Sequence, residues 1–517
     1  MVKEHKTVFG KYILDSLTRS MYENSKIIYR ELIQNGADAI DHAVEKGFLK
    51  DRAEGEIFIT IDKSERKITI EDNGIGIKTN ETLPKLMNIG DSDKDKETDK
   101  GSRGYGRLAA LGYCETLIIE TSYQGETVKN IVSWSAKELM ECLDNKKKED
   151  AAELFQRFVN RTEENETADL HYFKVILENV NDESLLEKQE IRDYLSMVAP
   201  VPFDGHFLLK DKIYDYVKKH LFSLDEYRIY LNTDQLCKPY TTIIYEGNEN
   251  NKERIDEISN IEFFYLPQNN PLLWGWYGVS SLKQQIPEKG NLARGLRLRK
   301  GNIQIGNSHC LVKLHKEPRG NLYFVGEVHA LHSSLDPNSQ RDYFVKNDIT
   351  KSFEELLRHF FHDELYNLYY FSSKLRSYQN QIEQFVKSNE KYEQKLQKGF
   401  KDKQEVQQDQ KRLEELKNKA AKAEKSIERI ASELPKEQSP KRRIFEKIIK
   451  IKKLEIEDIK PPVIPEGKKV KYWVDELTKL KKEERKLVAR VFSVVDKCLP
   501  DKDVIENIRL KIIEEFK

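Results

Sequence analysis

Residues 31–39 read Glu-Leu-Ile-Gln-Asn-Gly-Ala-Asp-Ala, and residues 72–77 read Asp-Asn-Gly-Ile-Gly-Ile. On a helix, Glu31, Asn35 and Asp38 lie at positions i, i+4 and i+7, so their three polar side chains share one face. A helix packed in a core would place apolar residues there. The first stretch therefore predicts a polar site on a helix, and the second stretch is a candidate to complete it.

The polar residues of this predicted helix suit the hydrolysis of a phosphoanhydride. Such a reaction needs a carboxylate that orients or deprotonates a water molecule. It also needs an oxygen ligand for the magnesium ion that neutralises phosphate charge. Glu31 can supply the carboxylate and Asn35 the amide oxygen, so the two are the candidate general base and the candidate magnesium ligand.

A predicted strand leads into the second stretch. Residues 67–71 alternate as a half-buried strand does and end on Asp72. The Asp72 carboxylate can accept a hydrogen bond from an exocyclic amine such as that of adenine, while Gly74 and Gly76 let the backbone approach a flat ring. Because ordinary tight turns use the same residue types, the motif gains its meaning from the helix that precedes it.

A glycine-rich loop follows at residues 101–111, which read Gly-Ser-Arg-Gly-Tyr-Gly-Arg-Leu-Ala-Ala-Leu and run into an apolar helix start. Backbone amides at a helix N-terminus can hold phosphate oxygens. Residues 91–100 are nearly all charged or small, which favours a mobile cover over the site. A plain solvated loop is the alternative. The candidate phosphate-binding residues are Gly101, Gly104, Tyr105 and Gly106.

In order and spacing, these segments resemble the GHKL ATPases, the superfamily of gyrase, MutL, histidine kinases and the ninety-kilodalton heat-shock chaperones. Residues 13–17 and 22–35 resemble the opening of the chaperone ATPase domain in particular. The resemblance implies an α+β chain that begins with a GHKL (Bergerat) α/β sandwich and takes ATP and Mg²⁺. It makes Glu31 the catalytic base, Asn35 the magnesium ligand and Asp72 the reader of adenine. It also implies that the nucleotide pocket is lined by Asp38 and Gly76.

The resemblance extends to an ATP lid. Residues 86–90, Leu-Met-Asn-Ile-Gly, resemble its start, so Asn88 is a candidate contact and the lid would span about residues 84–104. Lys94 falls where the family places a phosphate-facing lysine. The family also opens the strand that closes the pocket with a Gly-Thr pair. Residues 172–177 read Tyr-Phe-Lys-Val-Ile-Leu, so the sequence departs from the family there.

Composition predicts a soluble cytoplasmic protein. The 517 residues include 88 basic and 88 acidic side chains, so no net charge draws the chain to nucleic acid or to a membrane. The five cysteines are scattered, which argues against a zinc site or a disulfide framework. Neither an apolar signal segment nor an apolar run long enough to span a membrane occurs.

The first domain is predicted to cover residues 1–200, because Pro200 and Pro202 break a helix there. Residues 201–347 are strand-rich and resemble the transducer, or middle, domain that follows the ATPase domain in chaperones, MutL and gyrase. The strands predicted in it are residues 227–231, 272–279 and 295–300. The basic stretch at residues 294–300 is expected to form a solvated face, with a partner-binding face as the alternative.

Arg341 is the candidate catalytic residue of this second domain. Residues 332–342 read His-Ser-Ser-Leu-Asp-Pro-Asn-Ser-Gln-Arg-Asp and resemble the catalytic loop of the chaperone middle domain, in which an arginine reaches the γ-phosphate. A guanidinium supplied by a separate domain makes hydrolysis depend on domain closure. Asn338 is a candidate helper, and an arginine that pairs in an ordinary loop is the alternative.

Beyond the second domain the pattern becomes helical. Residues 348–435 carry apolar positions at heptad spacing, but the phase is lost near residues 399–410. A helical hairpin with its tip near Gly399 is favoured over one long helix with a stutter. Residues 436–466 combine a basic helix, expected to be solvated with an apolar packing side, with a Pro-rich linker. Residues 467–517 read as a helical module.

The predicted function is that of an ATP-gated clamp. Two protomers would meet when ATP binds, Arg341 would reach the γ-phosphate, and a protein partner would be remodelled as by a chaperone. The alternative is a nucleic-acid-associated ATPase of the MutL or MORC kind, in DNA maintenance or defence, which the coiled-coil pattern and the basic helix favour. A scaffold that binds nucleotide without hydrolysing it is a third class, against which the intact Glu31 argues.

Overall fold

The computed structural model describes residues 9–20, 24–88, 106–247, 251–400, 403–437, 439–449, 470, 472, 477 and 479–517. They belong to two compact units, Met1–Asn367 and Leu368–Lys517. Within these described stretches, no helix is long and apolar enough to cross a membrane.

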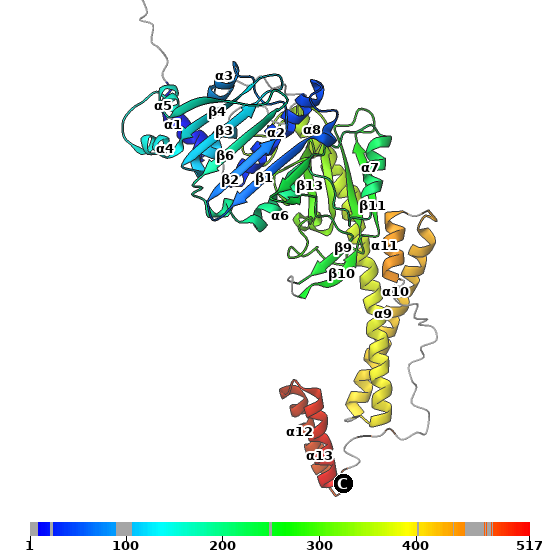
Figure 1. Ribbon diagram of the computed structural model, residues 1–517. Helices are drawn as coiled ribbons and strands as arrows, with labels where there is room; N and C mark the ends of the chain where they lie inside the picture. Colours follow the sequence, from blue (N-terminus) through cyan, green and yellow to red (C-terminus); the bar gives the residue numbers. More distant parts are fainter. Residues whose placement is uncertain are drawn as a thin grey trace, which may run out of the picture. The chain divides into compact units, whose positions relative to one another are not determined.

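An eight-stranded sheet forms the first layer of the first unit (Figure 1). Its order is β5-β4-β3-β6-β2-β1-β7-β8, and β1 and β7 form its parallel pair. In chain order the strands are β1 (Glu56–Asp62), β2 (Lys67–Asp72), β3 (Thr116–Ser122), β4 (Val128–Ser135), β5 (Val159–Asn165), β6 (Tyr172–Glu178), β7 (Arg228–Leu231) and β8 (Asp234–Gln235).

Helices cover one face of this sheet, and in the described part of the chain the other face carries no helix layer. Strand β1 shows why, because Ile57, Ile59 and Ile61 are buried in one core with the helices, whereas Phe58 between them is exposed. On the open face, cross-strand ion pairs such as that of Lys174 Nζ with Glu71 Oε2, at 2.9 Å, replace apolar packing. The helices of this part of the chain are α1 (Tyr12–Asp15), α2 (Ile27–Glu45), α3 (Thr82–Met87), η3 (Gly106–Tyr113), α4 (Ala136–Asp144), α5 (Ala151–Arg157) and α6 (Lys188–Val198). The predicted α/β sandwich is confirmed.

The first sheet continues past residue 200. Helix α6 ends at Val198, as expected from the prolines that follow. Strand β7, which the sequence assigned to the second domain, instead pairs in parallel with β1, with Ile229 opposite Ile57. The reason is that Ile229 and Leu231 complete the core of the first sheet. After residue 200 the chain therefore returns once to the first sheet, through β7. The domain boundary at residue 200 stays a prediction.

A second, five-stranded sheet has the order β11-β12-β15-β13-β14, next to a two-stranded pair of β9 and β10. Its core is rich in aromatic side chains, including Phe203, Tyr240 and Trp276. The elements are α7 (Lys210–Lys219), β9 (Ile243–Glu246), β10 (Glu253–Glu257), β11 (Asn260–Leu266), β12 (Leu273–Val279), β13 (Gly295–Lys300), β14 (Ile303–Ile305), β15 (Val325–Ala330) and α8 (Asp348–Phe360). This sheet carries the loop that holds Arg341.

The basic stretch at residues 294–300 does not form a solvated face, which corrects the expectation from sequence. Arg297 and Arg299 are buried in β13. The countercharge comes from Glu327 on β15, because Arg299 Nε donates to Glu327 Oε1 at 2.5 Å and Lys238 Nζ to Glu327 Oε2 at 3.1 Å. Arg299 also donates to the carbonyl of Met197 at the end of α6. A buried ion cluster therefore links the second sheet to the helix layer of the first.

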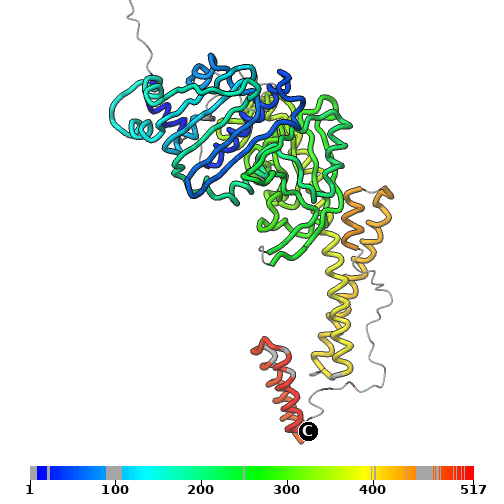
Figure 2. The backbone as a smooth tube through the Cα atoms, viewed as in Figure 1, coloured from blue at the N-terminus to red at the C-terminus, as the bar shows by residue number. Residues whose placement is uncertain are grey.

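The second unit is helical, and Figure 2 shows α9 and α10 side by side. Helix α9 (Tyr366–Lys398) and helix α10 (Lys403–Glu433) share a core that includes Phe385, Tyr392, Val406 and Leu413. Lys395 Nζ lies 2.5 Å from Glu405 Oε1, close to the turn between the helices. The two helices thus form a hairpin that turns around residue 399. The remaining helices are α11 (Pro440–Ile449), α12 (Lys482–Cys498) and α13 (Lys502–Phe516).

Candidate functional site

Helix α2 positions three of the predicted site residues. Its apolar side chains, among them Ile28 and Leu32, pack into the core of the first sheet. Glu31 and Asp38 are 7% and 2% exposed, and Asn35 is half-buried. Burying two carboxylates is costly unless partners or ligands compensate. The polar face of the helix is therefore enclosed, as a binding site requires.

Strand β2 delivers Asp72 to the same helix. Asp72 lies on the buried face of the sheet, and its Oδ1 accepts a hydrogen bond from the backbone amide of Gly74 at 3.0 Å. A Cβ atom built on Gly36 would lie 3.2 Å from Asp72 Oδ2. The carboxylate of Asp72 thus packs against α2 one residue after Asn35, and the structure brings the two sequence motifs together.

The glycines of the turn after β2 are required by contacts within the protein. A Cβ atom on Gly74 would lie 2.5 Å from that of Ala39 in α2. Gly76 has φ +67°, and a Cβ atom there would lie 1.9 Å from the carbonyl oxygen of Ser122. Tight packing between a helix, a turn and a strand end thus explains both glycines, with no need for a ligand.

Thr121 is a buried residue of this region that the sequence did not point to. Its hydroxyl accepts from the amide of Ile77 and donates to the carbonyl of Tyr172, both at 2.9 Å. In register, Thr121 lies opposite Phe173, which in turn lies opposite Asp72. Thr121 of β3 is therefore hydrogen-bonded to β6. Strand β6 is the one whose sequence lacks the Gly-Thr pair of the family. The signal in the sequence was its inward position in the alternation of Leu117, Ile119 and Thr121.

Arg341 reaches Glu31 from the second sheet. Arg341 Nε lies 3.0 Å from Glu31 Oε1, and Arg341 Nη2 lies 3.4 Å from Glu31 Oε2. Arg341 is 5% exposed, so the two-pronged ion pair is shielded from water. Arg30 Nη1 donates to the backbone carbonyl of Arg341 at 3.5 Å. Two consecutive residues of α2 therefore contact the loop that follows strand β15 of the second sheet.

A half-buried tyrosine, Tyr194, lies near the charges of Arg30 and Glu31. Burial raises the pKa of Tyr194 in α6 to about 12, with the charge of Arg30 opposing the rise and that of Glu31 adding to it. The phenol is therefore neutral at physiological pH and adds no charge beside Glu31.

The remaining predicted residues lie within residues 89–105, which the structure does not describe, or directly beside them. Lys94, Gly101, Gly104 and Tyr105, like most of the predicted lid, lie outside the described residues. Gly106 is the first residue of η3, a 3₁₀ helix, and its role in phosphate binding stays a prediction. Asn88 is exposed at the C-terminal end of α3. In the described stretches, no group of three His, Cys, Asp or Glu side chains is arranged to hold a metal ion.

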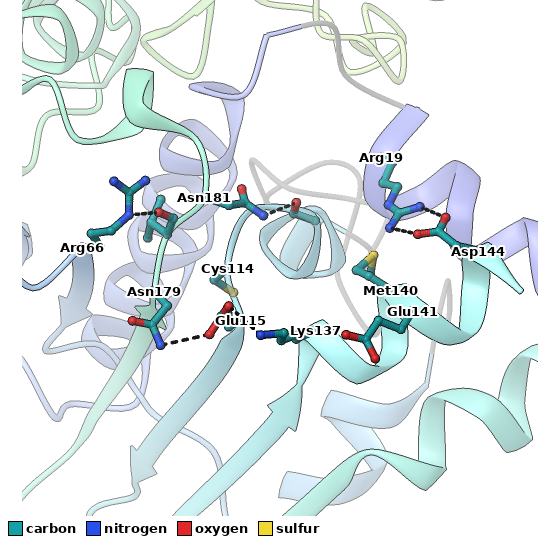
Figure 3. A pocket seen from close by; sticks show the side chains of 12 residues that line it. Arg19, Arg66, Cys114, Glu115, Lys137, Met140, Glu141, Asp144, Asn179 and Asn181 are labelled. Carbon is teal, nitrogen blue, oxygen red and sulfur yellow. Dashed lines mark hydrogen bonds and ion pairs between the residues drawn. The ribbon is translucent and has the colours of Figure 1, made fainter.

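A hollow of about 670 Å³ lies elsewhere on the first domain (Figure 3). Its three cations already have partners: Lys137 pairs with Glu115 at 3.1 Å, Arg66 with Glu183 at 3.0 Å, and Arg19 with Asp144. None of the predicted site residues lines it. Because its rim charges neutralise one another, the hollow offers no clear preference for an anion or a cation.

The sequence of the first domain matches known proteins. Residues 22–164 match the family described as histidine kinase-, DNA gyrase B- and HSP90-like ATPase. Chaperone protein HtpG of Alcanivorax borkumensis is 34% identical over 142 residues, which cover 24% of this chain and 23% of that protein. HtpG of Psychrobacter arcticus is 30% identical over 139 residues (24% and 21%), and HtpG of Nitrosococcus oceani is 29% identical over 158 residues (26% and 25%). The chain thus spans at most a quarter of the length of these relatives.

Proposed function

We propose that the chain binds and hydrolyses ATP at the polar face of α2, with Arg341 from the loop after β15 completing the site. The match of residues 22–164 to the HSP90-like ATPase family supports this proposal. The observation that carries the proposal is the buried contact of Arg341 with Glu31. It brings a guanidinium to the carboxylate that is the candidate base.

In the proposed reaction, Glu31 orients the attacking water and accepts its proton. The bond between the γ-phosphorus and the bridging oxygen breaks as the water oxygen bonds to phosphorus, which releases ADP and inorganic phosphate. Arg341 stabilises the negative charge that develops on the γ-phosphate oxygens. Asp72 accepts a hydrogen bond from the exocyclic amine of adenine at the other end of the site.

The residues present fit a magnesium ion bound together with ATP. Magnesium in nucleotide sites is held by one or two protein oxygens, phosphates and water rather than by a cage of protein ligands. Asn35 is half-buried between Glu31 and Asp38 on the same face of α2 and offers such an oxygen. When bound, the ion would neutralise phosphate charge.

Two substitutions test the roles separately. Replacing Arg341 with alanine should lower the turnover number on the order of 10³-fold, the scale found for arginines that stabilise a transferring phosphoryl group. Asp72→Asn should instead weaken ATP binding. The control is Arg52→Ala, because Arg52 also pairs with carboxylates but lies away from Glu31. Equal turnover in the Arg341→Ala and wild-type proteins would contradict the role of Arg341.

The cycle of ATP is proposed to drive a dimeric, chaperone-like clamp acting on a protein partner. The relatives named chaperone protein HtpG support the chaperone-like reading. A homodimer is supported by three exposed apolar side chains at i, i+4 and i+7 on α12, namely Leu487, Val491 and Val494. Sedimentation of the full chain with and without a non-hydrolysable ATP analogue measures whether two copies meet.

A nucleic-acid-associated ATPase is the second candidate, favoured by the basic helix α11. Its apolar residues Ile444, Phe445 and Ile448 are buried, as expected for a packing side, whereas Lys441 is exposed. Stimulation of turnover by DNA or RNA, measured at stated salt concentrations because such binding weakens with salt, would favour this candidate over the chaperone-like clamp.

A further inference from the structure

The carboxylate of Glu31 and a γ-phosphate would require the same cation. Both oxygens of Glu31 face the guanidinium of Arg341, at 3.0 and 3.4 Å. A base that receives a proton from water needs a free oxygen, whereas a carboxylate held by a two-pronged arginine has fewer directions left in which to accept a hydrogen bond. The contact that brings Arg341 to the site is therefore also a contact that occupies the base.

The loop of Arg341 is braced so that its backbone is held in place. The Pro337–Phe344 bridge closes the loop, and the amide of Asn338 donates to the carbonyl of Tyr343 at 2.8 Å. Asn338 Nδ2 also donates to Asp342 Oδ1 at 2.5 Å. Arg341 itself has φ +59°, a conformation that costs free energy in a residue with a side chain.

The carbonyl of Arg341 is fastened on two sides. It accepts from the amide of Gly306 at 2.9 Å, in addition to its contact with Arg30. The two hydrogen bonds to this carbonyl therefore offset the backbone strain of Arg341. Movement of the guanidinium away from Glu31 would then be a rotation of a long side chain about a fixed Cα atom, and no refolding of the loop would be needed.

We propose that Arg341 determines the response of the site to ATP as opposed to ADP, by moving between two anions: it rests on Glu31 and is drawn to the γ-phosphate. This inference rests on the proposed function. Moving a buried cation away from the carboxylate with which it pairs is costly unless another anion replaces that carboxylate. A γ-phosphate supplies that anion and carries more charge than a carboxylate, while ADP supplies none at this position. ATP therefore frees Glu31 at the moment when the base is needed, and ADP leaves the pair closed.

The test compares the affinity for a non-hydrolysable ATP analogue with that for ADP, measured by calorimetry in four proteins: wild type, Glu31→Gln, Arg341→Met and the double variant. If Glu31 competes for Arg341, Glu31→Gln should raise the ratio of analogue affinity to ADP affinity by about tenfold or more. In the Arg341→Met background the same substitution should raise the ratio clearly less, because no guanidinium is left to be released and only the loss of repulsion remains.

The double variant separates competition from simple repulsion. Glu31→Gln also removes a negative charge near the phosphates, which by itself would favour ATP. An equal gain in the presence and absence of Arg341 would assign the gain to lost repulsion and overturn the proposal, as would no gain at all. If Arg341→Met does not fold, Arg341→Lys takes its place. In that background, Glu31→Gln should raise the affinity ratio less than it does in the wild-type background, because lysine pairs with a carboxylate through a single point of contact.

Arg52 provides the control for the removal of an arginine. Arg52→Met removes another arginine that pairs with carboxylates and should leave the affinity ratio unchanged. Proteins that bind the analogue with an unaltered ratio would refute the movement of Arg341 while leaving ATP binding intact. Failure of the wild-type protein to bind either nucleotide would refute the proposed function itself, and the movement of Arg341 with it.

Discussion

Replacing Glu327 with glutamine should destabilise the first unit strongly. The carboxylate is fully buried and faces two buried cations, with Arg299 Nε at 2.5 Å and Lys238 Nζ at 3.1 Å, and it accepts from the hydroxyl of Tyr240 at 3.1 Å. Although burial opposes the shift, Arg299 and Lys238 hold the pKa of Glu327 well below its usual range, so the residue is a carboxylate at neutral pH. Glutamine keeps the shape and removes the charge.

The size of the effect follows from the two cations that remain. Breaking a buried ion pair by removing one partner costs about 3–5 kcal/mol. At about 2–4 °C per kcal/mol for a domain of 150–250 residues, the melting temperature should fall by roughly 6–20 °C, toward the lower end for this larger unit. Adding Lys238→Met removes one of the orphaned cations and should restore part of the loss.

Thermal unfolding followed by circular dichroism measures this difference. The control is Glu257→Gln, because Glu257 pairs with Arg254 on the surface, where ion pairs contribute little. A melting temperature of Glu327→Gln that falls no further than that of the control would show that the charge of Glu327 is not needed to compensate the two buried cations. It would mean that water or a rearranged side chain reaches Arg299 and Lys238.

Two further substitutions test the packing of the site and the pH dependence of the second domain. Gly47→Ala should lower the free energy of unfolding by about 1–2 kcal/mol, because Gly47 has positive φ. Gly76→Ala should lower it by well over this amount, because Gly76 also has positive φ and its new Cβ atom would meet the carbonyl of Ser122. Equal urea midpoints of the two variants would contradict this. Burial, opposed by a hydrogen bond with Asn321, lowers the pKa of His315 to about 4. The unfolded chain then binds more protons than the folded chain between about pH 4 and 6.5, so stability should fall as the pH drops through that range. His315→Phe should remove roughly 3 kcal/mol of this pH dependence. If the free energies of unfolding of wild type and His315→Phe, measured with urea, change in parallel between pH 7 and 4, this role of His315 is wrong.

The sequence was sufficient where the deciding contacts are local. The spacing of Glu31, Asn35 and Asp38 predicted helix α2, and alternation with a glycine turn predicted strand β2 and its Asp72. The helical pattern past residue 350 likewise indicated the long helices of the second unit, whose apolar positions recur locally. In each case one stretch of chain carries the whole signal.

The sequence was insufficient where the partner is distant. The basic stretch on β13 appears solvated until Glu327, on a strand later in the chain, is placed beside Arg299. Strand β7 pairs with β1 across more than 160 residues, which no local pattern records. Arg341 was picked out by a resemblance, but its contact with Glu31 depends on how two sheets pack. Burial of charge and parallel pairing are properties of the assembled fold, so periodicity could not reveal them.

The most direct test of the account measures ATP turnover and ATP binding in the same Glu31→Ala protein, beside wild type and Glu45→Ala, an exposed glutamate of the same helix. Glu31→Ala should bind ATP while its turnover falls to background, and Glu45→Ala should behave as wild type. Turnover by Glu31→Ala at the wild-type rate would contradict the assignment of Glu31 as the base and the proposal that ATP is hydrolysed at the polar face of α2.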